Sequence, residues 1–245
     1  MEQNELFSIL DTVDSTNNYA TGQVHAGLAR HGQAWFAMEQ IAGKGQRGKS
    51  WKSNPGQNLM LSIAVNPDKL FSTKPFLFSV LVAAVCREVF VQFAGDDIKI
   101  KWPNDIYWRD RKAGGILIEN IFRGSGWGWA IVGIGMNINQ TTFNESVTNG
   151  TSLKLITGKN YDPIIIAKQL QQLLLKKLDN IKNYEIWEYL EYYNEHLYKK
   201  GEATNLKKGN AVFKTKILSV NEYGQLLTKD AIDRTFEFGE VVWVK

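Results

Sequence analysis

The spacing of apolar and polar residues differs between two parts of this chain. Up to about residue 198, short apolar runs with the two-residue period of strands alternate with longer segments of helical period. Strands are predicted at residues 34–38, 59–65, 98–102, 115–122 and 127–134. Helices are predicted at residues 17–28, 75–93, 163–181 and 184–197. From Lys199 onward only short strand-like runs remain, separated by Gly, Asn and Asp.

Turn and capping residues extend this picture. The segment RGSG at residues 123–126 is typical of a hairpin turn between two strands. Ser15 or Thr16 is expected to cap the first helix, because a hydroxyl there satisfies free backbone amides. We therefore predict an α/β (α+β) domain with a mixed, largely antiparallel sheet and flanking helices in residues 1–198, followed by a small β-barrel domain in residues 199–245.

Composition narrows the class of protein. The 245 residues are 44% hydrophobic and 22% charged, as in a globular protein, and the net charge of +4 is too small to indicate a nucleic-acid partner. The single cysteine, Cys86, lies among apolar residues, which fits a buried thiol and a reducing cytoplasm. Residues 1–11 lack the regions of a secretory signal, and the apolar run at residues 76–86 is too short to span a membrane.

The most unusual segment is GKGQRGKSW at residues 43–51, which fits two phosphate-binding patterns, G-x-x-x-x-G-K-[ST] and G-x-G-x-x-G. Both patterns require a helix directly after the glycines, because the helix N-terminus holds the phosphate. The residues that follow include Pro55 and Gly56 and do not begin a helix, so both interpretations are rejected. Three glycines and three cations still suit an anionic ligand, but a solvated basic loop explains this segment equally well when it is taken alone.

Four further motifs occur along the chain with this loop. They are DSTN at residues 14–17, KWPND at 101–105, KAGGILIE at 112–119 and GIGMNIN at 133–139. With Glu39-Gln40 they closely resemble the catalytic domain of biotin-protein ligases over roughly residues 5–140. The resemblance implies the class II synthetase-like biotin/lipoate ligase fold with a C-terminal SH3-like barrel. It also implies a short form that lacks the N-terminal DNA-binding domain of the ligases that act as repressors, so no DNA partner is expected.

The resemblance assigns catalytic chemistry to three cations. Lys112 is the first choice, because its counterpart in the family contacts both the biotin carboxylate and the phosphate. Lys44 and Arg47 belong to the loop that folds over biotin and its adenylate, where Lys44 would neutralise charge that develops in the transition state. The alternative for Lys112 is an ordinary surface lysine. Gln46 departs from the family pattern, since many members carry a second arginine at this position.

The resemblance also assigns binding contacts. Ser15, Thr16 and Gln40 are expected to hydrogen-bond the ureido and ring atoms of biotin, and Asn137 is expected to face the adenine. The structural alternative for Ser15 is helix capping, and that for Trp51 is burial in the core. The complete set of expected binding residues is Ser15, Thr16, Asn17, Gln40, Gly43, Gly45, Gly48, Trp51, Asn104, Asp105, Gly114, Gly115, Ile116 and Asn137.

The implied enzyme activates biotin with ATP and transfers it to a lysine of a biotin carboxyl carrier protein or domain, as in acetyl-CoA carboxylase or a related carboxylase. Mg²⁺ is implied with ATP, and Asp105 is the expected metal ligand. A lipoate-protein ligase or octanoyltransferase of the same superfamily is the alternative, since fold does not separate these activities. We expect a cytoplasmic monomer or homodimer without a membrane partner.

Overall fold

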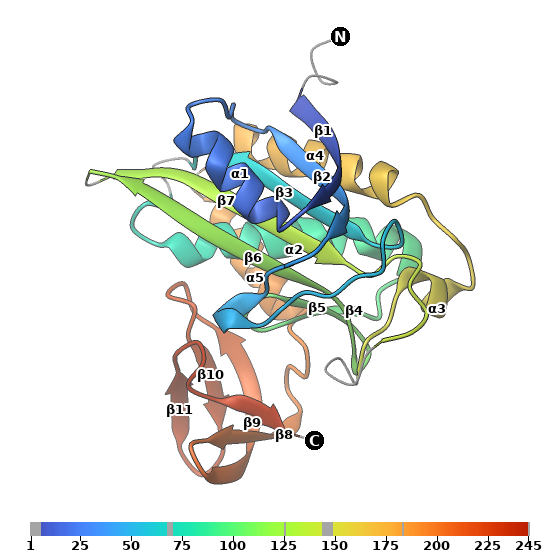
Figure 1. Ribbon diagram of the computed structural model, residues 1–245. Coiled ribbons are helices and arrows are strands. Elements are labelled where there is room, and N and C mark those ends of the chain that lie inside the picture. The colour runs from blue at the N-terminus through green and yellow to red at the C-terminus, as the bar shows by residue number, and fades with distance from the viewer. Residues whose placement is uncertain (1–5, 68–70, 125, 144–148, 183, 245) are drawn as a thin grey trace.

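The computed structural model describes residues 6–67, 71–124, 126–143, 149–182 and 184–244. Residues 1–5, part of the N-terminal segment predicted to lack a secretory signal, lie outside the described residues, as does Ser125 of the predicted hairpin turn. The described chain forms a sheet with helices packed against it and a second, smaller sheet near the C-terminus (Figure 1). The mixed helix-and-strand class predicted from the sequence is confirmed.

Seven strands make up the main sheet, in the order β1-β2-β3-β7-β6-β5-β4. Only β1 and β2 run parallel, and every other neighbouring pair is antiparallel. The strands β6 and β7 pair from Gly114↔Met136 to Arg123↔Gly126, as the predicted hairpin requires. The strands are β1 (Phe7–Val13), β2 (Ala34–Gln40), β3 (Leu59–Val65), β4 (Ile98–Lys101), β5 (Asp105–Trp108), β6 (Arg111–Arg123) and β7 (Gly126–Met136).

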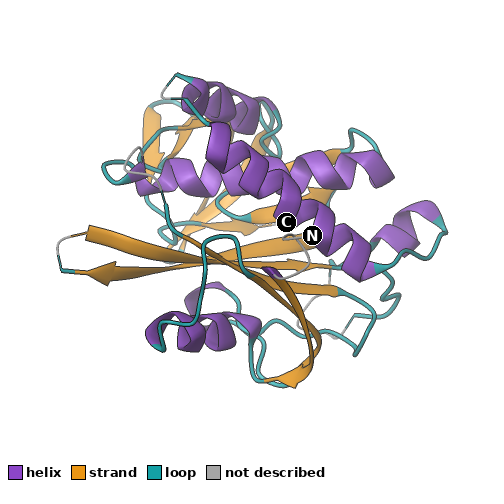
Figure 2. Cartoon of the chain, turned by 90° about the horizontal axis from the view of Figure 1, so that it is seen from above, coloured by secondary structure: helices purple, strands orange, loops and turns teal. Residues whose placement is uncertain are grey.

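Helices cover both faces of this sheet (Figure 2). The helix α1 packs against β2, β3 and β7, and it buries Ala20 and Val24 beside Trp35, Ala64 and Ile131 on one face. The larger core lies on the other face, where α2 and α4 pack. The helices are α1 (Thr16–His25), α2 (Pro75–Ala94), α3 (Leu153–Thr157), α4 (Pro163–Asn180) and α5 (Glu185–Glu195), with a short 3-10 turn, η2 (Gln46–Gly48).

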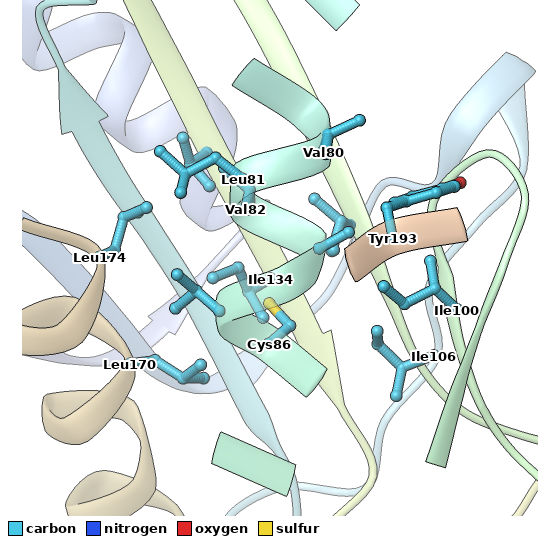
Figure 3. Packing of buried hydrophobic residues seen from close by; sticks show 14 of the residues in the cluster. Val80, Leu81, Val82, Cys86, Ile100, Ile106, Ile134, Leu170, Leu174 and Tyr193 are labelled. Atoms are coloured by element: carbon cyan, nitrogen blue, oxygen red, sulfur yellow. The ribbon is translucent and has the colours of Figure 1, made fainter. Parts of the chain in front are cut away.

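The helix α2 forms the centre of the larger core. Its residues Leu81 and Cys86 are fully buried between β-sheet residues such as Ile134 and the side chains Leu170 and Leu174 of α4 (Figure 3). The helix is long and apolar enough to cross a membrane, but 67% of its most apolar window is buried inside the protein. Burial of its apolar side chains in the core, at roughly 25 cal/mol per Å² of apolar surface, accounts for its hydrophobicity.

The second sheet has the order β11-β10-β9-β8-β12 and is antiparallel throughout. Its buried residues belong to the same contiguous apolar cluster as those of α2. One link is Trp102, whose indole N–H donates to Gly224 O at 2.8 Å. The division into domains 1–198 and 199–245, and the SH3-like class of the barrel, stay predictions. The strands are β8 (Ala203–Lys208), β9 (Ala211–Val220), β10 (Leu226–Lys229), β11 (Asp233–Phe236) and β12 (Val242–Val244).

Several short elements were not predicted from the sequence. The strand β1 is an edge strand with exposed residues at three of its seven positions, so it lacks a clear apolar period. The strand β5 and the helix α3 are only four and five residues long. Ser15 is the N-cap residue of α1, as predicted, but the prediction that its hydroxyl caps the helix is wrong, because its side chain makes no capping hydrogen bond.

Candidate active site

A pocket lies on the face of the main sheet that also carries α1. Glycines of β6 and β7 leave space at its floor: Gly115 pairs with Gly135, and in the neighbouring row Gly133 pairs with Leu117. A Cβ atom at Gly133 would lie 2.3 Å from Asn17, and one at Gly135 would lie 2.6 Å from Trp51. The glycines therefore permit α1 and the loop at residues 43–51 to approach the sheet closely.

One end of the pocket is neutral and polar, and it is built around the start of α1. Gln40 Oε1 accepts hydrogen bonds from the backbone N–H of Thr16 at 2.7 Å and from its hydroxyl at 3.0 Å. Ser62 Oγ donates to Asn17 Oδ1 at 2.6 Å and lies 2.7 Å from Thr16 Oγ1. This network fixes the orientation of the Gln40 amide, whose Nε2 has no hydrogen-bond partner among the described residues and is free to donate to a ligand.

The other end of the pocket is charged. Lys112 Nζ lies 2.6 Å from Asp105 Oδ1, and both side chains are mostly buried, with exposed fractions of 28% and 23%. Lys112 Nζ also lies 5.8 Å from the centre of the Trp51 ring. Residues i and i+2 of a strand lie on the same face, about 7 Å apart. The charged end lies beside Gly135 and the polar end beside Gly133, so the two ends are separated by about this distance along β7.

A β-bulge directs Lys112 into the pocket. In the β5–β6 pair, Ile106 is opposite Gly114 but Tyr107 is opposite Lys112, so Ala113 is an extra residue in β6. Side chains alternate between the two faces of a strand, so without the bulge Lys112 and Gly115 would lie on opposite faces. Because of the bulge, Lys112 and Gly115 lie on the same face of β6, and a Cβ atom at Gly115 would lie 3.4 Å from Lys112 Nζ.

The loop at residues 43–51 closes over one side of the pocket and is attached at two places. Lys44 Nζ lies 3.7 Å from Glu119 Oε1, and Glu119 Oε2 accepts a hydrogen bond from Asn17 Nδ2 at 2.6 Å. Arg47, whose φ of 56° is left-handed, donates from Nη1 to Gly239 O at 2.9 Å in the C-terminal sheet region. The loop is followed by extended chain and β3, which agrees with the rejection of the helix-dependent phosphate patterns.

The structure brings most of the expected site residues together. The expected residues that line the pocket are Ser15, Thr16, Asn17, Gln40, Lys44, Gly45, Trp51, Asn104, Asp105, Lys112, Gly115 and Ile116. The indole N–H of Trp51 is buried without a hydrogen-bond partner among the described residues. A ligand acceptor atom in the pocket would satisfy it, which favours a binding role for Trp51 over a purely structural one.

The other expected residues do not line the pocket. Gly43, Gly48 and Gly114 are outside its lining, and Arg47 extends toward Gly239. Asn137 is buried, and its Nδ2 donates to Thr151 O at 3.0 Å, which ties β7 to the segment that pairs with Lys112. The proposed contact of Asn137 with adenine and the catalytic assignment of Arg47 stay predictions.

Sequence reasoning did not select several residues that shape the pocket. The glycines of GIG at residues 133–135 are two residues apart, a spacing that leaves one face of a strand without side chains, and this signal was available in the sequence. Met60, Ser62 and Glu119 became visible only through pairing and hydrogen bonds.

A half-buried lysine lies beside the charged end. Lys101 is paired with Asp105 across β4 and β5, and its Nζ lies 3.1 Å from Tyr107 Oη and 5.3 Å from the centre of the Trp243 ring. Burial lowers the pKa of Lys101 to about 8, although Asp105 opposes the shift. The unfolded chain, with a lysine pKa of about 10.4, binds this proton more tightly than the folded protein does. The free energy of unfolding should therefore increase from about pH 8 to about pH 10, because deprotonation of Lys101 removes a charge that is unfavourable in the folded protein.

This pH dependence is testable by urea unfolding. The free energy of unfolding of the wild type should increase by up to about 2–3 kcal/mol between pH 8 and 10 relative to that of a Lys101→Met variant, since one pKa unit corresponds to about 1.4 kcal/mol. The variant is the control for all other groups that titrate in this range. Equal slopes for the two proteins would show that the pKa of Lys101 is not lowered.

Comparison with known proteins decides the family. The family model described as "Biotin/lipoate A/B protein ligase family" matches residues 9–137, which contain the entire pocket lining. This match covers more than half of the 245 residues. The chain belongs to the biotin/lipoate A/B protein ligase family.

Individual relatives of this family member are similar over different lengths. The bifunctional ligase/repressor BirA of Escherichia coli is 33% identical over 173 residues, which cover 70% of this chain and 53% of BirA. The biotin–[acetyl-CoA-carboxylase] ligase of Paracoccus denitrificans is 31% identical over 161 residues, covering 63% of this chain and 65% of the relative. The chain thus spans about half the length of the BirA proteins of Escherichia coli and Salmonella typhimurium that it matches.

Among solved structures, the biotin protein ligase of Aquifex aeolicus in complex with biotin and ATP superimposes with a TM-score of 0.80 at 26% identity. The match covers 96% of this chain and 97% of the Aquifex chain, so it includes both sheets. It confirms that the fold predicted for the main sheet is the ligase fold of this family.

Proposed function

We propose that this protein is a biotin-protein ligase, which forms biotinyl-adenylate from biotin and ATP and then transfers the biotinyl group to a lysine of a carrier protein. The observation that carries the proposal is the pocket with two chemically different ends. The neutral polar end at Thr16 and Gln40 suits the ureido ring, and the cationic end at Lys112 suits the carboxylate and the α-phosphate. The name of the Paracoccus relative, a biotin–[acetyl-CoA-carboxylase] ligase, and the Aquifex ligase solved with biotin and ATP support the same substrates.

In the first step, an oxygen of the biotin carboxylate forms a bond to the α-phosphorus of ATP. The bond from that phosphorus to the bridging oxygen breaks, and pyrophosphate leaves with the electron pair. Negative charge is concentrated on the carboxylate and phosphate oxygens, and in this proposal Lys112 binds them. Asp105 holds the ammonium of Lys112 at 2.6 Å, so the cation is already oriented before the reaction begins.

In the second step, a neutral lysine amine attacks the acyl carbon of the adenylate. The C–N bond forms, the C–O bond to the phosphate breaks, AMP leaves, and the amine proton passes to solvent. No covalent enzyme intermediate is required. Cys86, the one thiol of the chain, is fully buried in α2 and burial raises its pKa, so it does not supply a nucleophile to the pocket.

Mg²⁺ belongs to this proposal as the partner of ATP. No group of three His, Cys, Asp or Glu side chains capable of holding a metal occurs in the described part of the chain. Magnesium, however, is often held by one carboxylate together with substrate phosphates and water. Asp105 fits this role, because it lies in the pocket and only its Oδ1 is paired with Lys112. The ion would supply positive charge to the triphosphate.

Removal of Mg²⁺ should therefore abolish adenylation but not the binding of biotin. With excess EDTA, biotin-dependent exchange of pyrophosphate into ATP should fall at least 100-fold and return on addition of Mg²⁺, because the charge of the triphosphate is no longer neutralised. Calorimetric titration with biotin under the same conditions is the control. Full exchange activity in EDTA would contradict a requirement for the metal.

The activity itself is tested by ATP–pyrophosphate exchange with biotin, lipoate or octanoate supplied in parallel. Exchange with biotin alone is the expected result. Exchange with lipoate instead would favour a lipoate-protein ligase, and the absence of exchange with all three acids would refute an adenylating ligase. The acceptor we propose is a biotin carboxyl carrier domain of acetyl-CoA carboxylase, as the name of the Paracoccus relative suggests, and the proposed location is the cytoplasm.

A further inference from the structure

A second cleft adjoins the active-site pocket at the boundary with the C-terminal sheet. Three residues, Gln46, Asn104 and Ile116, line both cavities, so the two are adjacent at this point of β6. The second cleft encloses about 670 Å³, including its open mouth. One wall comes from α2 and the chain between β4 and β5. The opposite wall comes from two turns of the C-terminal sheet, at Tyr223-Gly224 and at Glu237-Phe238.

The two walls are held together by direct contacts. The Trp102 and Phe238 rings meet edge to face with their centres 6.1 Å apart, and Trp102 Nε1 donates to Gly224 O at 2.8 Å. Trp102 stands two residues before Asn104, which lines both cavities. The position of the C-terminal turns is therefore coupled to the junction with the active-site pocket. This arrangement favours a permanent cleft over a chance gap between two mobile parts.

The lining of this cleft suits a long aliphatic side chain that ends in an amine. Phe76, Tyr223 and Phe238 supply aromatic rings, and two of these rings already contact cations: Arg47 Cζ lies 5.6 Å from the Phe238 ring centre, and Lys74 Nζ lies 5.5 Å from that of Tyr223. Glu237 is the one acidic residue among the described residues that line the cleft. Its carboxylate would attract an ammonium group to the mouth.

The inner end of the cleft favours the neutral form of the acceptor amine. There an incoming amine leaves water and approaches the ammonium group of Lys112 in the adjoining pocket, and both effects favour the neutral, nucleophilic form. The cleft thus combines attraction of the cation at its mouth with release of the proton near the reacting carbon.

We propose that this cleft, formed by α2 on one side and the turns at Tyr223-Gly224 and Glu237-Phe238 on the other, is the route by which the acceptor lysine reaches the activated carboxyl group. The proposal rests on the proposed ligase function. It gives the C-terminal sheet a defined part in the second half-reaction. Residues Tyr223 and Glu237 then determine access of the acceptor and have no part in the formation of the adenylate.

The test separates the two half-reactions. In Tyr223→Ala and Glu237→Lys variants, kcat/KM for a purified biotin carboxyl carrier domain should fall at least 10-fold. Biotin-dependent ATP–pyrophosphate exchange, and trapping of the adenylate by hydroxylamine, should stay within twofold of wild type. Hydroxylamine is small enough to react without the cleft, so it reports an intact adenylate site and a folded protein. Asp233→Lys is the matched control, because it makes the same charge change at an exposed position of β11 outside the cleft.

Two results would overturn the route while leaving the ligase function in place. One is undiminished transfer to the carrier domain in both variants. The other is a parallel loss of exchange or a raised KM for ATP, which would assign the cleft to the nucleotide. Failure of the wild type to catalyse biotin-dependent exchange would instead refute the ligase function and the route together.

Discussion

Replacement of Lys112 by alanine should reduce biotin-dependent ATP–pyrophosphate exchange by about 100- to 1000-fold, the range typical for loss of one group that stabilises transition-state charge. The bulge at Ala113 directs this lysine into the pocket, and Asp105 fixes its ammonium at 2.6 Å. No other lysine is bound to Asp105 at such a short distance in the described chain. The exchange rate at saturating biotin and ATP measures the effect.

Two controls separate catalysis from folding. Lys112→Ala leaves the carboxylate of Asp105 without its partner, so the free energy of unfolding of this variant, measured with urea, tests whether that unpaired charge destabilises the protein. Lys214→Ala removes a lysine at an exposed position of β9 and should leave exchange unchanged. Exchange within threefold of wild type in Lys112→Ala would exclude this residue from the mechanism.

A single methyl group at Gly135 should damage the pocket nearly as severely. In Gly135→Ala the new Cβ would lie 2.6 Å from Trp51 Cε2 and 2.8 Å from Trp51 Cζ2, so the indole has to move away from the floor and into the ligand space. Overpacking of this kind costs about 1–3 kcal/mol. We expect the dissociation constant of biotin, measured by calorimetry, to rise about 10- to 100-fold.

Gly22→Ala is the matched control for this substitution. Gly22 lies within α1, and a Cβ atom there would have no neighbour within 4 Å. Alanine in a helix is favoured over glycine by roughly 1 kcal/mol, so this variant should bind biotin normally and unfold at a slightly higher temperature. Unchanged affinity in Gly135→Ala would mean that the ligand does not use the space between β7 and Trp51.

Much of the fold followed from the sequence because its longest elements are strongly patterned. The helix α2 has proline at its first position and a nearly continuous apolar stretch, and β3 is buried at all seven positions. The edge strand β1 escaped prediction because an edge strand buries only part of its side chains, which weakens the apolar period.

The sequence by itself determined the chemistry available to the site: the basic glycine-rich loop, the polar group at residues 14–17 and the lysine at the start of KAGGILIE. The tertiary structure alone decided how these groups are oriented. Arg47 contacts Gly239, and the side-chain amide of Asn137 donates a hydrogen bond to Thr151 O. One extra residue in β6 directs Lys112 into the pocket. Strand register and bulges arise from contacts between segments far apart in the chain, so a local pattern of residue types does not specify them.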